Sequence, residues 1–222
     1  MKNKWILFIL VLTIGITMLA CSTSNILPGS GDGGDSSSTS SNVLFDDDFS
    51  NDKSGWDIYE DADMMTGYEN DMFVVLNNVP QYYTYAYANK NLSDTSIVVE
   101  STLLSGPMDV ESGIICRSNY ENFYYAIVSI DGYYGIAKAI GDDFEYIQMD
   151  AMYQNAAINL GNETNTIRFD CIGNELTLYV NGELLTSVTD DTLTSGDIGF
   201  IVGTYDEGGA KFGFDNLVVN KP

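Results

Sequence analysis

The chain has 222 residues and a formal charge of −23, with 32 acidic residues against 9 basic ones. A surface of this charge repels nucleic acid and anionic lipid headgroups, which disfavours both as direct partners. The sequence contains no histidine. It therefore lacks the commonest general base and transition-metal ligand, and it can form no Ser-His or Cys-His nucleophile system.

The N-terminus has the features of a secretory signal: Lys2 and Lys4 precede an uncharged run from Trp5 to Ala20, and Cys21 follows. The end of this run resembles a bacterial lipobox, with Met18 where leucine is usual. The resemblance implies that residues 1–20 are a signal peptide and that acylated Cys21 anchors the protein to the outside of the cell membrane. The alternative is an uncleaved transmembrane anchor, but sixteen apolar residues fall short of the roughly 20 that a spanning helix needs.

Residues 21–43 follow as a predicted linker. They are mostly Ser, Thr, Gly, Asn and Asp, without hydrophobic periodicity. Such a segment cannot bury enough apolar surface to order itself, so a flexible tether is expected between the lipidated cysteine and one domain at residues 44–222.

Short strand signals separated by turn residues fill the rest of the chain, and no long helical period occurs. This pattern predicts an all-β fold, a sandwich of two antiparallel sheets. The predicted strands outside the central stretch are Leu44–Phe49, Met72–Asn77, Tyr82–Ala88, Ile97–Leu104, Gly113–Arg117, Phe123–Ile130, Tyr133–Ile140, Phe144–Met149, Ile198–Thr204 and Lys211–Val219.

Residues 165–188 are the centre of the predicted sheet, three strands joined by two-residue turns. Gly173-Asn174 suits a type II′ turn and Asn181-Gly182 a type I′ turn. The resulting register places an apolar row on the core face and a polar row opposite it. The apolar row is Ile167, Phe169, Cys171, Leu176, Leu178, Val180 and Leu185, and the polar row is Arg168, Asp170, Thr177, Tyr179 and Thr186.

Several motifs resemble the concanavalin A-like lectin and glucanase jelly rolls. They are Phe-Asp-Asp-Asp-Phe-Ser at 45–50 with Ser54-Gly55-Trp56, the hairpin at 176–182, and Phe214-Asp-Asn-Leu-Val-Val219. The stretch from Gly113 to Gly135 is similar to secreted bacterial members near the 3-keto-disaccharide hydrolase family. The resemblance implies a concave sheet of the kind that often binds glycans.

Cys116 and Cys171 both fall on predicted central strands of an exported chain. An oxidising compartment favours a disulfide between them. The alternative is a pair of buried thiols, which pack as small apolar side chains.

A ligand-binding face is predicted from the same register. Asp131-Gly132 is interpreted as a type I′ turn, which places Tyr124 and Tyr133 beside small residues on one face of its hairpin. Arg117 has the opposite parity to Cys116 and should join Arg168, Asp170 and Tyr179 outside the core. Aromatic platforms with charged hydrogen-bonding groups suit a sugar ring. The alternative is that these tyrosines pack beneath loops.

Three aspartates are candidate ligands of a structural Ca²⁺ ion. Asp47 and Asp48 open the domain and Asp215 nearly closes it, and the first and last strands of jelly rolls are often neighbours. Calcium is bound by oxygen ligands and needs no histidine. The alternative is a solvated acidic strand end.

Catalysis is disfavoured by the departure from the glucanase Glu-x-Asp-x-(x)-Glu strand motif. Glu69-Asn-Asp71 has no third acid, whereas retaining hydrolysis needs two carboxylates about 5–5.5 Å apart. The sequence therefore predicts a lipid-anchored, extracytoplasmic module that binds glycan or cell-surface polysaccharide. The alternatives are a carboxylate-based glycoside hydrolase or lyase of the same fold and a protein-binding adhesion module.

Overall fold

The fold is taken from a computed structural model that describes residues 42–222. The predicted signal peptide, Cys21 and the linker up to residue 41 lie outside the described residues. Within residues 42–222, no helix is long and apolar enough to cross a membrane.

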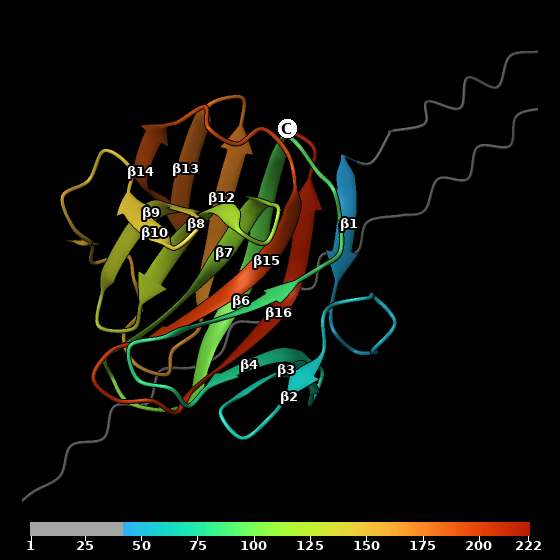
Figure 1. The fold of residues 1–222 in the computed structure, drawn as a ribbon, viewed down its shortest axis with the longest axis vertical. Helices are drawn as coiled ribbons and strands as arrows, with labels where there is room; N and C mark the ends of the chain where they lie inside the picture. Colours follow the sequence, from blue (N-terminus) through green and yellow to red (C-terminus); the bar gives the residue numbers. More distant parts are fainter. Residues whose placement is uncertain (1–41) are drawn as a thin grey trace, which may run out of the picture. The chain divides into compact units, whose positions relative to one another are not determined.

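Residues 42–222 form two antiparallel β-sheets and contain no α-helix, which confirms the predicted all-β sandwich (Figure 1). The nine strands of sheet A follow the spatial order β14 (Glu183–Thr189), β13 (Glu175–Val180), β12 (Asn165–Ile172), β6 (Thr95–Ser105), β16 (Ala210–Asn220), β4 (Met72–Asn77), β3 (Met64–Glu69) and β2 (Tyr59–Glu60), with β1 (Val43–Asp47) paired to β16. The seven strands of sheet B follow the order β10 (Asp143–Tyr146), β9 (Tyr133–Ile140), β8 (Asn122–Ser129), β7 (Val110–Ser118), β15 (Asp197–Thr204) and β5 (Tyr83–Tyr87), with β11 (Tyr153–Gln154) paired to β9.

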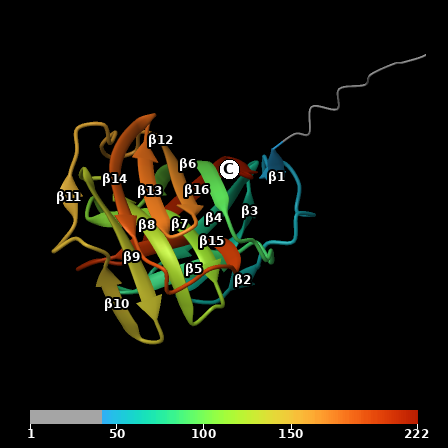
Figure 2. The same ribbon diagram turned by 90° about the horizontal axis from the view of Figure 1, so that it is seen from above.

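The main core lies between the two sheets. Figure 2 shows β12, β13 and β14 of sheet A on one side of the molecule and β8, β9 and β10 of sheet B on the other. Phe200 of sheet B stacks on Trp56 and on Phe214 of sheet A, with centroid distances of 4.5 and 4.1 Å. The Trp56 indole N–H donates to the Asp47 carboxylate at 3.1 Å, so its one polar atom is satisfied inside the core.

The two turns and the strands β12 and β13 agree with the sequence prediction, whereas β14 departs from it at a bulge, where Leu178 pairs with Thr186 instead of Leu185. Asn181 and Gly182 both have positive φ, 52° and 84°, as a type I′ turn requires, and Gly173 has φ 57°, as the first position of a type II′ turn requires. Ile167 pairs with Val180 and Phe169 with Leu178, and all four are buried. The turns therefore set the register, and the register puts the apolar row in the core.

The hairpin of β8 and β9 differs from the prediction by one residue. Its loop has three residues, 130–132, and only Gly132 has positive φ (100°), so the turn is not type I′. Val128 pairs with Tyr134 instead of Gly135. A one-residue slip turns the side chains of one strand to the other face. Tyr133 therefore leaves the face that it was predicted to share with Tyr124. Tyr124 itself pairs with Cys116 of β7 and lies in the inter-sheet core, at 0% exposure.

Cys116 of β7 and Cys171 of β12 form the predicted disulfide, which joins sheet B to sheet A. The two cysteines are 55 positions apart. In the chain-entropy account, closing a loop of this length in the unfolded state stabilises the fold by about 4 kcal/mol.

The predicted exposure of Arg117 is wrong: only 2% of this residue is accessible. The register of β7 against β15 shifts at this point, and Arg117 has φ 54°, which breaks the alternation of faces on which the prediction depended. Its guanidinium instead reaches three connections at one end of the sandwich. It donates to the carbonyls of Cys171 (3.1 Å), Gly173 (2.8 Å), Leu193 (2.9 Å) and Ser93 (3.2 Å) and to the Asp94 carboxylate (3.0 Å).

We expect Arg117→Ala to lower the free energy of unfolding by about 3–5 kcal/mol, because it leaves several carbonyls without a donor in a closed site. Arg117→Lys should recover only part of the lost free energy of unfolding, since one ammonium group cannot reach all five acceptors. The half-exposed pair of Lys211 and Glu69 provides the control, and Lys211→Ala should cost about 0–1 kcal/mol. Urea unfolding followed by tryptophan fluorescence measures all three. Equal losses for Arg117→Ala and Lys211→Ala would contradict the structural role.

Candidate functional site

The outer face of sheet B is covered by aromatic side chains. Tyr83, Tyr85 and Tyr87 alternate along the edge strand β5, so all three point to this face. Phe123 and Tyr125 alternate on β8 in the same way. We call this surface the aromatic face; it consists of Tyr83, Tyr85, Tyr87, Phe123, Tyr125, Phe144 and Tyr146, with Ile115, Ile127, Ala137, Ala139 and Ile201 between them.

Small residues opposite the aromatic ones let the rings lie close to the sheet. Tyr87 pairs with Gly199 and Tyr83 with Gly203, while Tyr125 pairs with Ala137. At Gly203, a Cβ atom would come within 2.5 Å of the Tyr83 ring. A larger residue there would lift Tyr83 from the sheet, so the height of this ring depends on the glycine.

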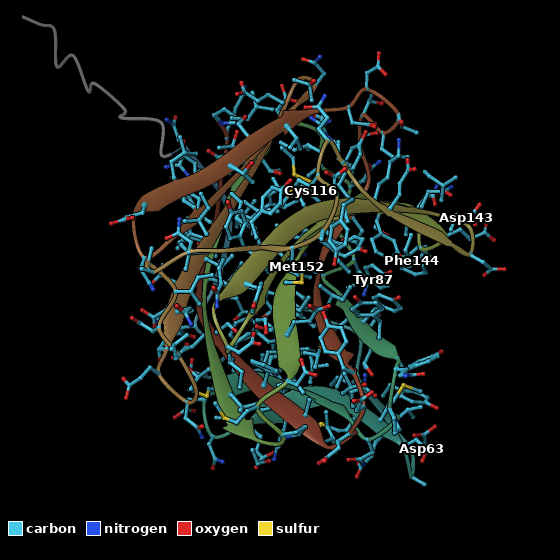
Figure 3. The ribbon with its side chains drawn as sticks, turned by 90° about the vertical axis from the view of Figure 1, so that its left-hand side faces the viewer. Asp63, Tyr87, Cys116, Asp143, Phe144 and Met152 are labelled. Carbon is cyan, nitrogen blue, oxygen red and sulfur yellow. A yellow bond between two sulfur atoms is a disulfide. The ribbon has the colours of Figure 1, made fainter. Side chains whose placement is uncertain are left out.

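A groove of about 740 Å³ lies along the aromatic face. One wall comes from β5 and the other from β10, whose Phe144 is 46% exposed. The Phe144 and Tyr83 rings are 5.8 Å apart and inclined by 22°. Figure 3 shows Phe144 and Tyr87 on the same side of the view, with Met152 nearer its middle. The groove is lined by Gln81, Tyr82, Tyr83, Tyr85, Tyr120, Glu121, Phe123, Gly141, Asp142 and Phe144.

Glu111 is buried beneath one end of this face and holds two tyrosines. Its carboxyl oxygens accept hydrogen bonds from the hydroxyls of Tyr83 and Tyr205, both at 2.6 Å. Only 1% of the residue is exposed. Burial raises the pKa of Glu111, and the two tyrosine hydrogen bonds oppose that rise. Because Tyr83 lines the groove, Glu111 fixes the position of a groove residue without reaching the groove itself.

Burial also keeps the tyrosines of this face protonated. It raises the pKa of Tyr146 to about 12 and the pKa of Tyr85 above its usual value. At neutral pH these side chains therefore present hydroxyl groups that can both donate and accept hydrogen bonds.

The predicted ligand-binding set is not brought together. Tyr124 is in the core and donates to Asp190 at 2.6 Å, while Arg117 is closed into the end of the sandwich. Tyr133 is 38% exposed on sheet B, outside the groove lining. The shared face predicted for these residues is therefore wrong.

The remaining three predicted ligand residues lie together on the outer face of sheet A. Arg168 binds the Asp170 carboxylate through Nε (2.8 Å) and Nη2 (2.5 Å), and its guanidinium lies 4.5 Å from the Tyr179 ring centroid. Asp170 is 5% exposed. The polar groups of this cluster mainly satisfy one another.

The proposed calcium ligands also have other partners. β1 does pair with β16, as expected, but Asp47 accepts from Trp56 and from the Phe49 N–H (2.9 Å), and Asp48 accepts from Ser50. Among residues 42–222, no group of three or more acidic or cysteine side chains is arranged to hold a metal ion. Asp47, Asp48 and Asp215 therefore do not form the predicted set.

The fragment of the glucanase motif at Glu69-Asn70-Asp71 lies in the turn between β3 and β4, where Asn70 and Asp71 both have positive φ. Glu69 pairs there with Lys211 at 2.7 Å. The sequence analysis missed Tyr83, Tyr85, Tyr120, Phe144 and Glu111. The signal for the first two was present, since tyrosines alternate at 83, 85 and 87 within a predicted strand.

A match to a known protein family covers the whole folded domain. Residues 40–219 match the family model of the 3-keto-alpha-glucoside-1,2-lyase-like domain. No curated protein sequence matches the chain.

Solved structures share the fold at low sequence identity. A carbohydrate-binding module of family 66 from Bacillus subtilis is 16% identical, with a TM-score of 0.62 over 76% of this chain and 96% of that one. A Bacillus subtilis protein of unknown function with a galectin-like fold is 9% identical, with a TM-score of 0.62 over 80% and 95%. A Bacillus licheniformis beta-glucanase is 12% identical, with a TM-score of 0.59 over 80% and 98%.

The raised pKa of Glu111 predicts a pH dependence of stability. The folded state holds this proton more tightly than the unfolded state, so the contribution of Glu111 to stability falls as pH rises from the ordinary pKa of 4.5 towards the raised value. In Glu111→Gln, the free energy of unfolding should lack this part of its decline with rising pH. Urea unfolding of both proteins between about pH 4 and pH 8 gives the difference curve. A difference that does not vary with pH would contradict the prediction.

Proposed function

Since the chain belongs to the family of 3-keto-alpha-glucoside-1,2-lyase-like domains, we propose that its groove on sheet B binds an uncharged glycan. The observation that carries this proposal is the row of aromatic rings along a groove of about 740 Å³. Pockets that bind small molecules are concave and lined mainly by apolar and aromatic side chains, with a few polar groups that orient the ligand.

The chemistry of the face suits a sugar ring. A pyranose or furanose ring has an apolar C–H surface that can lie on an aromatic side chain, and hydroxyl groups around its edge. Phe144 and Tyr83 offer the aromatic surface, and the hydroxyls of Tyr82 and Tyr85 offer donors and acceptors.

The charge of the groove favours an uncharged ligand. Of the described residues that line it, Glu121 and Asp142 are acidic and none is basic. The whole chain carries −23. Like charges across an interface oppose association, so uronic-acid, sulfated and sialylated chains are poor ligands. The names of two proteins that share the fold, a carbohydrate-binding module and a beta-glucanase, agree with a glycan ligand.

Binding without turnover is the proposed activity. The two acids in the groove lining, Glu121 and Asp142, are both exposed, and the buried Glu111 already accepts two hydrogen bonds. A lyase is the second candidate. The family description names one, and Glu111, a buried carboxyl group with a raised pKa, is hydrogen-bonded to the groove residue Tyr83, which makes this pair a candidate for proton transfer.

We also propose that the domain is held outside the cell by a lipid anchor. The support is the order of basic residues, apolar run and Cys21, with the segment between Cys21 and Asn42 as the tether; the predicted linker end at residue 43 is shortened, because Val43 already belongs to β1. Two or more acyl chains give stable anchoring, whereas one chain binds a membrane only reversibly.

We expect Phe144→Ala to weaken glycan binding by about 3- to 10-fold, because it removes one stacking surface. The residue is nearly half exposed, so stability should change little. Tyr153→Ala is the control, an equally exposed aromatic residue outside the groove lining. Calorimetric titration with laminarin, lichenan, levan, xylan and mannan measures affinity, with polygalacturonate and alginate as anionic comparisons.

Wild-type protein that binds no neutral glycan in this panel would contradict the proposed function. Equal effects of Phe144→Ala and Tyr153→Ala would move the site away from the groove. Chromatography of each mixture after incubation tests the second candidate, and new reducing or unsaturated sugars would establish turnover.

The anchor is tested with Cys21→Ala in the full chain. This variant should take up no labelled palmitate and should leave the membrane fraction, whereas wild type stays with it. Cys21→Ala that remains in the membrane fraction would favour an uncleaved transmembrane segment.

A further inference from the structure

A second cavity adjoins the groove. We propose that it is a second sugar subsite, so that the ligand is an oligosaccharide bound across Tyr120. This inference rests on the proposed function and adds the length of the ligand. The cavity has a volume of about 450 Å³, and we call it the end pocket; it is lined by Asn89, Lys90, Asn91, Ser118, Asn119, Tyr120, Ser195, Gly196 and Asp197.

Tyr120 connects the two sites, because it lines both the groove and the end pocket. The side chain is 57% exposed, and its ring packs edge-on against Tyr87 at 5.0 Å and 80°. Its backbone has φ 76°, a conformation that costs a bulky residue about 1–3 kcal/mol. An aromatic residue kept at this cost while half exposed is better explained by a ligand than by packing.

The lining of the end pocket differs from that of the groove. Amide and hydroxyl groups replace aromatic rings, and each can donate and accept hydrogen bonds as sugar hydroxyls do. The side chains of Asn91 and Ser195 are exposed and form no hydrogen bond within residues 42–222. They are therefore available to a ligand without breaking an existing contact.

The walls of the end pocket are held in place before any ligand arrives. Asp197 is 5% exposed and accepts the backbone N–H groups of Asn89 (3.0 Å), Lys90 (2.7 Å) and Ile198 (2.8 Å). Leu92 and Gly196 exchange two backbone hydrogen bonds, of 2.8 and 2.9 Å. A preformed site loses less entropy on binding, which favours weak ligands such as sugars.

The two charged residues of the end pocket have opposite signs. The Lys90 ammonium lies 4.8 Å from the Phe45 ring centroid, and Asp197 is held by three N–H groups. The pocket therefore offers no excess of positive charge to an anionic sugar. Its ligand class is the same as that of the groove, an uncharged sugar unit, which allows one chain to occupy both.

The test is a titration of wild type with sugars of increasing length. The probes are glucose with laminari-oligosaccharides, xylose with xylo-oligosaccharides and fructose with fructo-oligosaccharides, from one to about six units. Wild-type affinity should rise by about tenfold or more once a chain spans both sites. The double variant Asn91→Ala/Ser195→Ala should lose this gain and keep its affinity for the shortest ligand.

Two further variants separate the subsite from general damage. Tyr120→Ala should weaken both short and long ligands, since the residue lines both cavities. Asn162→Ala changes an exposed asparagine outside both linings and should bind as wild type does.

The outcomes distinguish this inference from the proposed function. Wild type that binds oligosaccharides without any gain from length, or a double variant that keeps the full gain, overturns the second subsite and leaves the groove as the binding site. Wild type that binds none of these sugars overturns both.

Discussion

The arrangement of the loops at one end of the sandwich depends on the hydrogen bonds of the Arg117 guanidinium group. Its five hydrogen bonds reach the β5–β6, β12–β13 and β14–β15 connections, which belong to different parts of the chain. The neighbouring Cys116 is bonded to Cys171, so a covalent and a polar link between the sheets lie side by side. Residues 89–91 and 195–196 of the end pocket belong to two of these connections, β5–β6 and β14–β15. Arg117 therefore helps to hold two walls of the end pocket, although it does not line the pocket itself.

The two faces of sheet B pack against different partners. The inner face packs Tyr124, Ala126 and Ile136 against sheet A, and the outer face carries its own apolar cluster. An ordinary antiparallel sheet would leave that outer face polar. Here glycines and alanines let rings lie on it, and Glu111 fixes one ring by its hydroxyl. The side chains of the aromatic face pack against one another and bury part of this surface. The groove along it remains accessible to solvent.

The sequence predicted best where turn chemistry decides the backbone. Gly173-Asn174 and Asn181-Gly182 each form a two-residue turn, and together they set the register of β12, β13 and the start of β14. The sequence predicted poorly where one extra loop residue or one β-bulge determines which face of the sheet a side chain lies on. The three-residue loop at 130–132 puts Tyr133 on the opposite face from Tyr124, and the bulge at Arg117 turns that residue from the expected ligand site into the interior. The groove was beyond sequence reasoning because it joins β5 to β10, strands at opposite edges of sheet B.

The pairing of β1 with β16 has a consequence for how the domain can be shared between proteins. The carbonyl of Asn42 accepts the N–H of Lys221 at 2.7 Å, so the two ends of the folded unit are neighbours. A unit whose ends meet can be inserted into a surface loop of another protein without stretching its host, and its ends can be joined and the chain reopened at an exposed loop. The domain can therefore be part of a longer polypeptide and keep its fold and its groove.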